Sequence, residues 1–429
     1  MRYPPINPSL FAENRIRLKS LLKPHSLAVF HSSDVMPTSA DGQHPFIQHT
    51  DILYLSGIDQ EETILVLCPD AMEEKHREIL FIRETSERIA IWEGSKYTQQ
   101  EARELSGIAT VYWTREFEAV FRTLVIESET IYLNTNEHLR IDPVVETRDM
   151  RFLKWCMGAY PLHHYERLAP PMQHLRAIKS PQEVQLIRHA GQITEKAFCR
   201  VLSFIKPDVW EFEIEAEIIH EFLKNRSRGP AYASIIASGK NACILHYEHN
   251  DRQCRSGDLV LMDFGAEYAG YASDMTRTVP VNGRFTPRQK AVYNAVCRVL
   301  KAASAMLAPG NTMTEYQKAV GQVMEKELVD LGLLSMSDLR AQSDTAPAYR
   351  KYLMHGVSHH LGLNTHDYGS RYRAFEPGMV LTVEPGIYII EEALGIRLEN
   401  DIVITADGPV DLMKDIPLEA DCIEGMMHP

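Results

Sequence analysis

Residues 259–278 read LVLMDFGAEYAGYASDMTRT and constrain the fold more than any other stretch of the chain. The first part is an apolar run of strand character that ends in Asp263 and a glycine, and the second part carries Asp274. Burying a carboxylate without a partner costs several kcal/mol, so Asp263 needs a cation, a hydrogen-bond cluster or contact with water. A metal ion would satisfy both acids, whereas a hairpin with one acid at each surface-facing end needs none. This stretch alone leaves both interpretations open.

The length of 429 residues predicts two domains. A net charge of -13, without clusters of Lys and Arg, argues against binding to nucleic acid. We find no apolar segment of signal-peptide or membrane-spanning length, so we expect a cytoplasmic protein with no membrane partner. The seven cysteines are scattered without CxxC spacing, which fits reduced thiols and excludes a thiolate zinc knuckle.

Residues 1–170 alternate helix-like and strand-like pieces, which predicts an α/β layer domain. Ser9 is placed to cap a helix over residues 10–22, and residues 115–125 have helical character. Short apolar runs bounded by turn residues predict strands at 27–30, 52–55, 63–67, 78–82, 109–113 and 130–133. The region has no phosphate loop, nucleophile elbow or metal-ligand spacing, so we expect it to support or assemble the protein.

Pro170 and Pro171, followed by residues 172–179, predict a stiff extended connection and a domain boundary at 170/171. Directly afterwards, Ser180-Pro181-Gln182-Glu183 predicts a capped helix start and a long helix to about Ile205. Similar openings occur at 286–289 and 312–315, and residues 210–225 predict a further helix. Residues 171–429 are therefore predicted to be α+β, with about four long helices among the strands.

Four carboxylates and one imidazole occur in the last 190 or so residues, with each acid in a strand-like run among apolar or small neighbours: Asp263, Asp274, His359, Glu384 and Glu399. Glu384 precedes Pro385-Gly386, which ends its strand abruptly and fixes the carboxylate at the strand terminus. Carboxylates with an imidazole suit hard or borderline divalent ions such as Mn²⁺. Two such ions about 3.5–4 Å apart can share a water and lower its pKa towards 7.

At this point the chain resembles a known family, the pita-bread metallopeptidases, and within it aminopeptidase P, the Xaa-Pro aminopeptidases. The matching motifs are ILHY at 244–247, LMDFG at 261–265, SDMTRT at 273–278, MHGVSHHLG at 354–362, HD at 366–367, EPGIY at 384–388 and GIRLEND at 395–401. The resemblance covers residues from about 175 to the end. YLSG at 54–57 and IWEG at 91–94 extend it less specifically into the first domain.

The resemblance implies a C-terminal pita-bread catalytic domain at 171–429 and a smaller N-terminal α/β domain of the creatinase/aminopeptidase P type at 1–170. It implies that Asp263, Asp274, His359, Glu384 and Glu399 bind two divalent ions, usually Mn²⁺. Asp274 and Glu399 would bridge the two ions. Asp263 would complete the coordination shell of one ion, and His359 with Glu384 would complete that of the other. The family also tends to form dimers or tetramers through the first domain.

The implied reaction is hydrolysis of the peptide bond between an N-terminal residue and a following proline, by attack of a metal-bridging hydroxide. Glu384 would accept the proton of the bridging water. His246 and His366 stand at the positions that contact the substrate carbonyl and the tetrahedral intermediate, where an imidazole can donate to the oxyanion and pass a proton to the leaving nitrogen.

Two further residues have implied roles at the same site. His355 matches a histidine that lines the substrate site. Arg397 precedes Glu399 by two residues on the same strand face and would orient a carboxylate, although a surface ion pair is the competing interpretation for it.

Three alternatives stay open. Prolidase carries a nearly identical metal set and accepts only dipeptides, and the WEG motif of the first domain favours aminopeptidase P over it. A catalytically inactive pita-bread binding protein and a metal-free creatine-type hydrolase share the fold, but relatives of those kinds lose several of the five ligands. This chain keeps all five.

Overall fold

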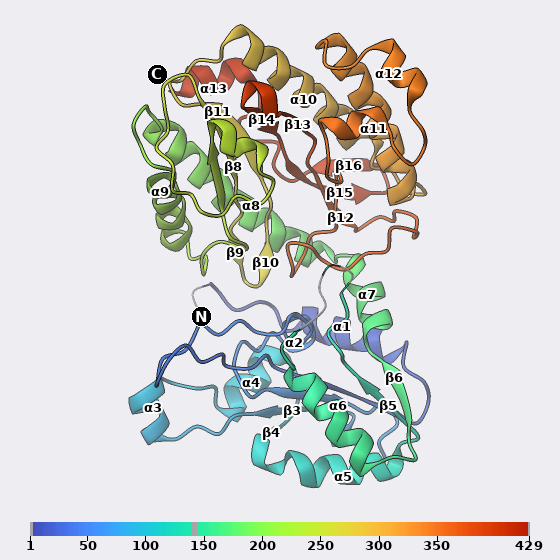
Figure 1. Ribbon diagram of the computed structural model, residues 1–429. Helices are drawn as coiled ribbons and strands as arrows, with labels where there is room; N and C mark the ends of the chain where they lie inside the picture. The colour runs from blue at the N-terminus through green and yellow to red at the C-terminus, as the bar shows by residue number, and fades with distance from the viewer. Residues whose placement is uncertain (1–2, 139, 141–143, 428–429) are drawn as a thin grey trace. The chain divides into compact units, whose positions relative to one another are not determined.

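The structure is a computed structural model that describes residues 3–138, 140 and 144–427. The chain divides into two compact units, here called the N-terminal unit (residues 3–175) and the C-terminal unit (residues 176–427). Figure 1 shows the elements of both along the chain. None of the helices in these described ranges is long and apolar enough to cross a membrane.

The N-terminal unit is built on a mixed six-stranded sheet in the order β4-β3-β2-β1-β5-β6. β1 pairs with β2, and β2 with β3, in antiparallel fashion, whereas the remaining neighbours are parallel. The strands are β1 (Ser26–His31), β2 (Ile64–Leu67), β3 (Glu78–Ile82), β4 (Thr110–Trp113), β5 (Thr130–Leu133) and β6 (His164–Arg167). This confirms the predicted α/β layer domain and five of its six predicted strands.

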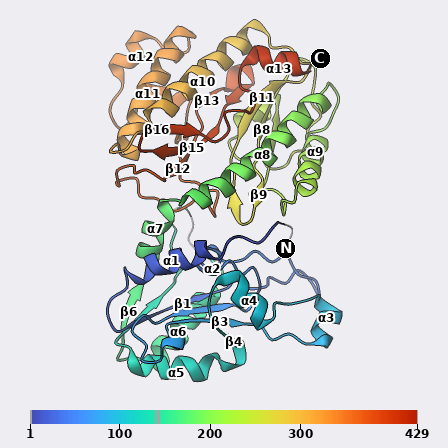
Figure 2. The same ribbon diagram turned by 180° about the vertical axis from the view of Figure 1, so that it is seen from behind.

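The helices of this unit are α1 (Ser9–Lys19), α2 (Thr50–Ser56), α3 (Glu87–Glu93), α4 (Gln99–Ser106), α5 (Phe117–Glu127) and α6 (Arg148–Ala159). One core forms where α5 and α6 cover the sheet, with Val29 of β1 and Phe81 of β3 buried against Phe117 and Phe121 of α5. Figure 2 shows the same unit from behind.

Three local predictions in this region are wrong. Residues 52–55 lie in α2 rather than in a strand, because the His49 side chain caps the helix start and Gly57, at φ 67°, ends it. Ser9 is the first residue of α1 rather than its cap, and the helix ends at Lys19. Pro170 and Pro171 lie in α7 (Ala169–Ala177) rather than in an extended connection. The first turn of a helix tolerates proline because its N–H groups have no intrahelical partner.

Four long helices shape the C-terminal unit: α8 (Pro181–Phe204), α9 (Glu211–Lys224), α10 (Pro287–Met306) and α11 (Met313–Asp330). Capping boxes open α8 at Ser180, α10 at Thr286 and α11 at Thr312, which confirms the predicted starts. Two shorter helices, α12 (Met336–Ala341) and α13 (Ala420–Met427), follow later in the chain.

The strands of this unit form small antiparallel sheets in the orders β11-β8-β7, β12-β15-β16, β13-β14 and β10-β9. Their bounds are β7 (Ile235–Ser238), β8 (Leu259–Asp263), β9 (Glu267–Tyr268), β10 (Tyr271–Ala272), β11 (Thr276–Pro280), β12 (Val380–Val383), β13 (Gly386–Ile389), β14 (Leu394–Arg397), β15 (Asn400–Thr405) and β16 (Gly408–Asp411). Helices and strands share one core, which includes Phe198 of α8, Val260 of β8 and Val296 of α10. The unit is α+β, as predicted (Figures 1 and 2).

Candidate active site

Junctions between strands carry the four carboxylates singled out in the sequence. β8 pairs with β11 so that Asp263 faces Thr276, which places Asp263 at the end of β8 and Asp274 just before β11. Glu384 lies between β12 and β13, and Glu399 between β14 and β15. The Glu399 N–H donates to the Thr276 carbonyl at 3.0 Å, which joins the β14–β15 junction to the start of β11.

These side chains converge with His359. Ligand atoms of Asp274, His359 and Glu399 lie within 4.8 Å of one another. His359 Nε2 lies 3.5 Å from Asp274 Oδ2 and 3.8 Å from Glu384 Oε1. The Tyr232 hydroxyl, 2.6 Å from Asp263 Oδ1, also contacts Asp274. The hairpin with separate surface acids, left open above, is therefore wrong.

Burial and mutual repulsion disfavour the ionised form of three of these acids. Burial, followed by neighbouring carboxylates, raises the pKa values of Asp274, Glu384 and Glu399 well above their usual range. Arg397 lowers each of these pKa values without reversing the direction. The donor set of carboxylate oxygens and one imidazole fits hard or borderline divalent cations, whose charge would offset this repulsion.

Arg397 lies inside the site and is 4% exposed, so the surface-pair interpretation is wrong. Its Nη2 donates to Asp263 Oδ2 at 2.6 Å, and its Nε donates to Thr276 Oγ1 at 3.1 Å. The Thr276 hydroxyl in turn donates to Glu399 Oε2 at 2.7 Å. Arg397 thereby contacts Asp263 directly and Glu399 through a threonine.

His355 is joined to Arg397 through Tyr388. Arg397 Nη1 donates to the Tyr388 hydroxyl at 2.9 Å, and that hydroxyl lies 2.8 Å from His355 Nε2. Because His355 Nδ1 lies 2.7 Å from the Gly356 carbonyl, Nδ1 carries the hydrogen and Nε2 accepts from Tyr388. Burial, together with Arg397, lowers the pKa of His355 to about 4. The ring is neutral at pH 7 and lies 3.6 Å from Glu384 Oε2.

The two remaining histidines lie on separate loops beside this cluster. The His366 ring packs against the His359 ring at 4.2 Å between centroids, nearly perpendicular at 84°. His246 is exposed and interacts electrostatically with His355. Its loop is held by the buried Glu211, which accepts hydrogen bonds from the Tyr247 hydroxyl at 2.8 Å and from the Arg252 N–H at 2.9 Å.

Sequence analysis assigned no role to Tyr232, Tyr388 or Asp401. The Asp274 N–H donates to Asp401 Oδ2 at 3.1 Å, and burial raises the pKa of Asp401 well above its usual range. Tyr232 lies 31 residues from Asp263 along the chain. No local pattern around these residues distinguishes them from core positions.

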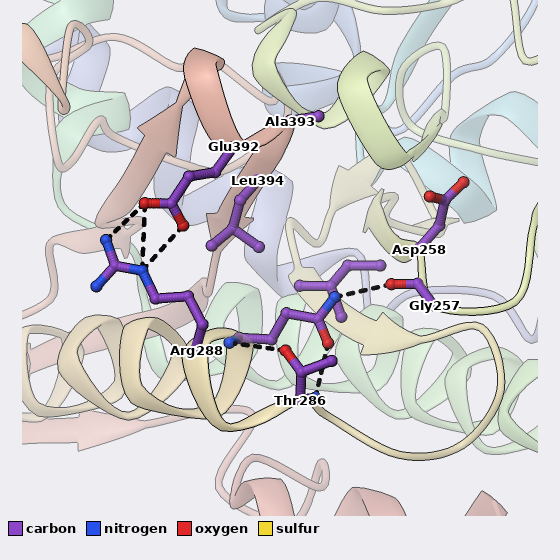
Figure 3. A pocket seen from close by; sticks show the side chains of 9 residues that line it. Gly257, Asp258, Thr286, Arg288, Glu392, Ala393 and Leu394 are labelled. Carbon is purple, nitrogen blue, oxygen red and sulfur yellow. Dashed lines mark hydrogen bonds and ion pairs between the residues drawn. The ribbon is translucent and has the colours of Figure 1, made fainter.

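A cavity of about 210 Å³ lies elsewhere in the C-terminal unit (Figure 3). Leu259 and Leu394, at the first positions of β8 and β14, line it, whereas Asp263 and Arg397 stand at the last positions of the same strands. Arg288 closes one side by its ion pair with Glu392 at 2.7 Å. None of the predicted site residues lines this cavity.

Comparison with known proteins agrees with this geometry. Residues 185–406 match the model of metallopeptidase family M24, and residues 11–132 match that of the aminopeptidase P N-terminal domain. The Xaa-Pro aminopeptidase of Escherichia coli K12 is 36% identical, over 97% of both chains. Human Xaa-Pro aminopeptidase 3 is 32% identical over 90% of this chain and 78% of its own, and mouse Xaa-Pro dipeptidase is 28% identical over 98% and 93%.

Solved structures give the same relationship. Aminopeptidase P from E. coli in its low-pH form matches with a TM-score of 0.90 at 33% identity, covering 99% of both chains. Pseudomonas aeruginosa aminopeptidase PepP matches with a TM-score of 0.90 at 32% identity, covering 99% of this chain and 98% of its own. A zinc-substituted E. coli aminopeptidase P in complex with product also matches, with a TM-score of 0.88. These matches and the gathered ligand atoms support divalent-metal binding, and the chain belongs to the Xaa-Pro aminopeptidases of metallopeptidase family M24.

Proposed function

We propose that this protein hydrolyses the peptide bond between an N-terminal residue and a following proline, as an Xaa-Pro aminopeptidase. The observation that carries the proposal is the convergence of four carboxylates with His359 in a chain of this family. The substrates are peptides with proline at the second position.

We further propose that two divalent ions, Mn²⁺ in the cell, are held by Asp263, Asp274, His359, Glu384 and Glu399. The charge count is compatible with two ions: four carboxylates and the Arg397 guanidinium leave a net charge of about -3 when ionised, one divalent ion would bring it to about -1, and two ions with one hydroxide would bring it to about 0. When bound, such ions polarise a carbonyl oxygen and lower the pKa of water.

The side chains in and around the cluster would transfer protons, contact the substrate and orient the metal ligands. Glu384 is placed to accept a proton, because its carboxylate lies within the cluster, 3.8 Å from His359 Nε2. His246 and His366 would contact the substrate carbonyl and pass a proton to the leaving proline nitrogen, while His355, neutral and fixed by Tyr388, lines the substrate site. Arg397 would orient Asp263 through its hydrogen bond of 2.6 Å.

Prolidase is the second candidate, and the match to a mouse Xaa-Pro dipeptidase over most of both chains keeps it testable. The higher identity to Xaa-Pro aminopeptidases and the matched N-terminal domain favour aminopeptidase P. The inactive and metal-free alternatives are disfavoured, because the five ligand side chains are present and gathered.

One assay tests the proposal. Mn²⁺-loaded protein is incubated with an Xaa-Pro dipeptide, a longer Xaa-Pro peptide and a matched Xaa-Ala peptide. We expect release of the first residue from the longer Xaa-Pro peptide and little from Xaa-Ala. Cleavage of the dipeptide alone would identify a prolidase, and no cleavage of either proline peptide would refute a proline-specific peptidase.

Glu384→Gln is the matched variant, because it keeps the shape of the side chain and removes its basic group. We expect a loss of about 10²–10⁴-fold in kcat, the range for removal of a general base. Unchanged turnover in the metal-loaded variant would remove Glu384 from the mechanism.

The assembly and the compartment are also proposals. The exposed Ile91 and Trp92 on α3, a helix that buries none of its own residues, support self-association into a dimer or tetramer through the N-terminal unit. Light scattering of wild type against a Trp92→Ser variant would test this self-association.

The compartment is a separate proposal. The seven free cysteines support a location in the cytoplasm, where thiols stay reduced.

A further inference from the structure

A second buried ion cluster lies beside the candidate active site, in the motif that carries His366. Asp367 Oδ1 accepts a hydrogen bond from Arg176 Nη2 at 2.7 Å, and its Oδ2 lies 3.2 Å from Lys179 Nζ. The three side chains are 2%, 1% and 1% exposed, respectively. Burial alone would raise the pKa of Asp367, but Arg176 and Lys179 hold it below its usual value, so this carboxylate is ionised.

The cluster anchors the chain directly after His366. The Asp367 N–H donates to the His360 carbonyl at 2.8 Å. The next residue, Tyr368, lies under the Arg176 guanidinium at 4.5 Å from the ring centroid. His366 is therefore followed by two residues whose side chains both contact Arg176.

Close packing leaves this arrangement little room to move. A Cβ atom on Gly362 would lie 2.1 Å from Asp367 Oδ2 and 2.8 Å from Lys179 Cε. Only glycine fits there without displacing the cluster. The Gly362 carbonyl also accepts the Ala272 N–H at 2.8 Å, which joins the cluster to the strand that leads to Asp274.

The same loop reaches a proposed metal ligand through one carbonyl oxygen. His359 Nδ1 lies 3.0 Å from the His360 carbonyl, the group that also accepts the Asp367 N–H. Since a carbonyl only accepts, His359 Nδ1 carries a hydrogen, and its Nε2 faces Asp274 and Glu384. The His360 carbonyl thus ties the His359 ring and the Asp367 backbone together.

We propose that Asp367, held by Arg176 and Lys179, is a positioning residue that fixes the His366 ring against His359. The proposal rests on the proposed function, since it assigns the cluster to the placement of His366 in the peptidase site. It gives a role to Asp367, to which the proposed function assigns neither a metal nor a substrate contact.

A double-mutant cycle with Asp367→Asn and His366→Ala tests the coupling in metal-loaded protein. Asp367→Asn alone is expected to lower kcat/KM for an Xaa-Pro tripeptide about 10–100-fold, the usual effect of losing a group that orients a ligand. In the His366→Ala background the same change should have little further effect, because the ring it positions is gone. If the fold-losses in kcat/KM of the two single variants multiply in the double variant, the proposal is overturned.

Two controls separate positioning from general damage. Asp367→Asn combined with His246→Ala should show multiplied losses, since His246 lies on another loop. Asp421→Asn removes an acid that pairs with Lys290 but is 87% exposed, and it should leave kcat/KM unchanged. If Asp421→Asn reduces activity as much as Asp367→Asn does, the cluster has no special connection with His366.

A spectroscopic readout is independent of turnover. In zinc-loaded protein with ¹⁵N-labelled histidine rings, Asp367→Asn should shift or broaden the signal assigned to His366 and leave that of His246 unchanged. An unmoved His366 signal would overturn the proposal even if activity fell. If the wild type cleaves no Xaa-Pro peptide, the proposed function fails, while this signal still decides whether Asp367 positions the ring.

Should Asp367→Asn not fold, Arg176→Lys is measured in the same way. It keeps the charge but loses the planar group that bonds Asp367 and lies over Tyr368. A wild-type His366 signal together with wild-type kcat/KM in Arg176→Lys would likewise refute the role of the cluster.

Discussion

The C-terminal unit buries two charge clusters, and their charges are balanced in opposite ways. Around Asp367, two cations face one acid, and the pKa of Asp367 is lowered. Around Arg397, acids outnumber the guanidinium, and burial with mutual repulsion raises the pKa values of most of them: Asp274, Glu384 and Glu399. The first cluster supplies its own countercharge, whereas the second is short of positive charge.

This difference separates a structural ion cluster from a binding site. A buried carboxylate with its own cations gains nothing from an added ion, whereas gathered carboxylates without enough cations are stabilised by one. The same residue types therefore serve two purposes in one unit. The sign of the charge imbalance distinguishes the two, and it predicts opposite responses to mutation, to pH and to metal.

The largest expected effect is the loss of activity in Glu399→Gln. Removing a ligand should lower kcat/KM at least about 10³-fold, more than the 10–100-fold typical of groups that only orient ligands. In metal-free protein the same change should raise the melting temperature, because it relieves repulsion with Asp274. Calorimetry in the presence of a chelator measures this melting temperature. A lower melting temperature in the metal-free variant would contradict the proposed difference between the two clusters.

Asp367→Asn should change stability in the opposite direction. Removing the acid takes away the carboxylate charge that faces Arg176 and Lys179, and breaking a buried pair costs about 3–5 kcal/mol. Urea unfolding of metal-free protein measures this loss. Equal changes in Asp367→Asn and Glu399→Gln would mean that the two clusters do not differ.

The pH dependence of metal-free stability should differ between the clusters. Raised pKa values at Asp274, Glu384 and Glu399 mean that the folded state binds more protons than the unfolded state, so their contribution is lost as pH rises above about 4. The contribution of Asp367, whose pKa is lowered, is instead lost as pH falls below about 4.

Added metal sharpens this contrast. An ion at 100 times its dissociation constant should add about 2.7 kcal/mol to the free energy of unfolding at pH 7. The gain should disappear in Glu399→Gln and persist in Asp367→Asn. Thermal unfolding with and without Mn²⁺ provides the comparison, and an equal gain in all three proteins would place the ion elsewhere.

The smallest expected effect is that of Tyr232→Phe. Its hydroxyl bonds both Asp263 and Asp274, so its loss should weaken metal affinity about 10-fold while the metal-free fold is kept. Titration calorimetry with Mn²⁺ measures the change. Unaltered affinity would show that the tyrosine does not orient the two aspartates.

The sequence predicted those parts of the fold that depend on local signals. Capping boxes at Ser180, Thr286 and Thr312 involve residues three apart, so the starts of the long helices are readable in the chain. The strand predicted at residues 52–55 was wrong because a short apolar run suits a strand as well as a helix. The side chain that caps the helix start there is that of His49.

The gathering of the acids was predictable, whereas their partners were not. An acid in an apolar run needs a cation, a hydrogen-bond cluster or contact with water, and this requirement brought Asp263 and Glu399 into view. Tyr232 joins Asp263 across 31 residues, and Arg176 joins Asp367 across 191 residues. Such pairs follow from the packing of distant segments and leave no spacing pattern in the sequence.

Metal binding measured by titration calorimetry, with elemental analysis of the dialysed protein, tests most directly whether the carboxylate cluster is the metal site. We expect two Mn²⁺ ions per chain in the wild type, and weakened binding in Glu399→Gln but not in Asp367→Asn. Fewer than one tightly held ion per chain, or equal binding by all three proteins, would contradict the assignment.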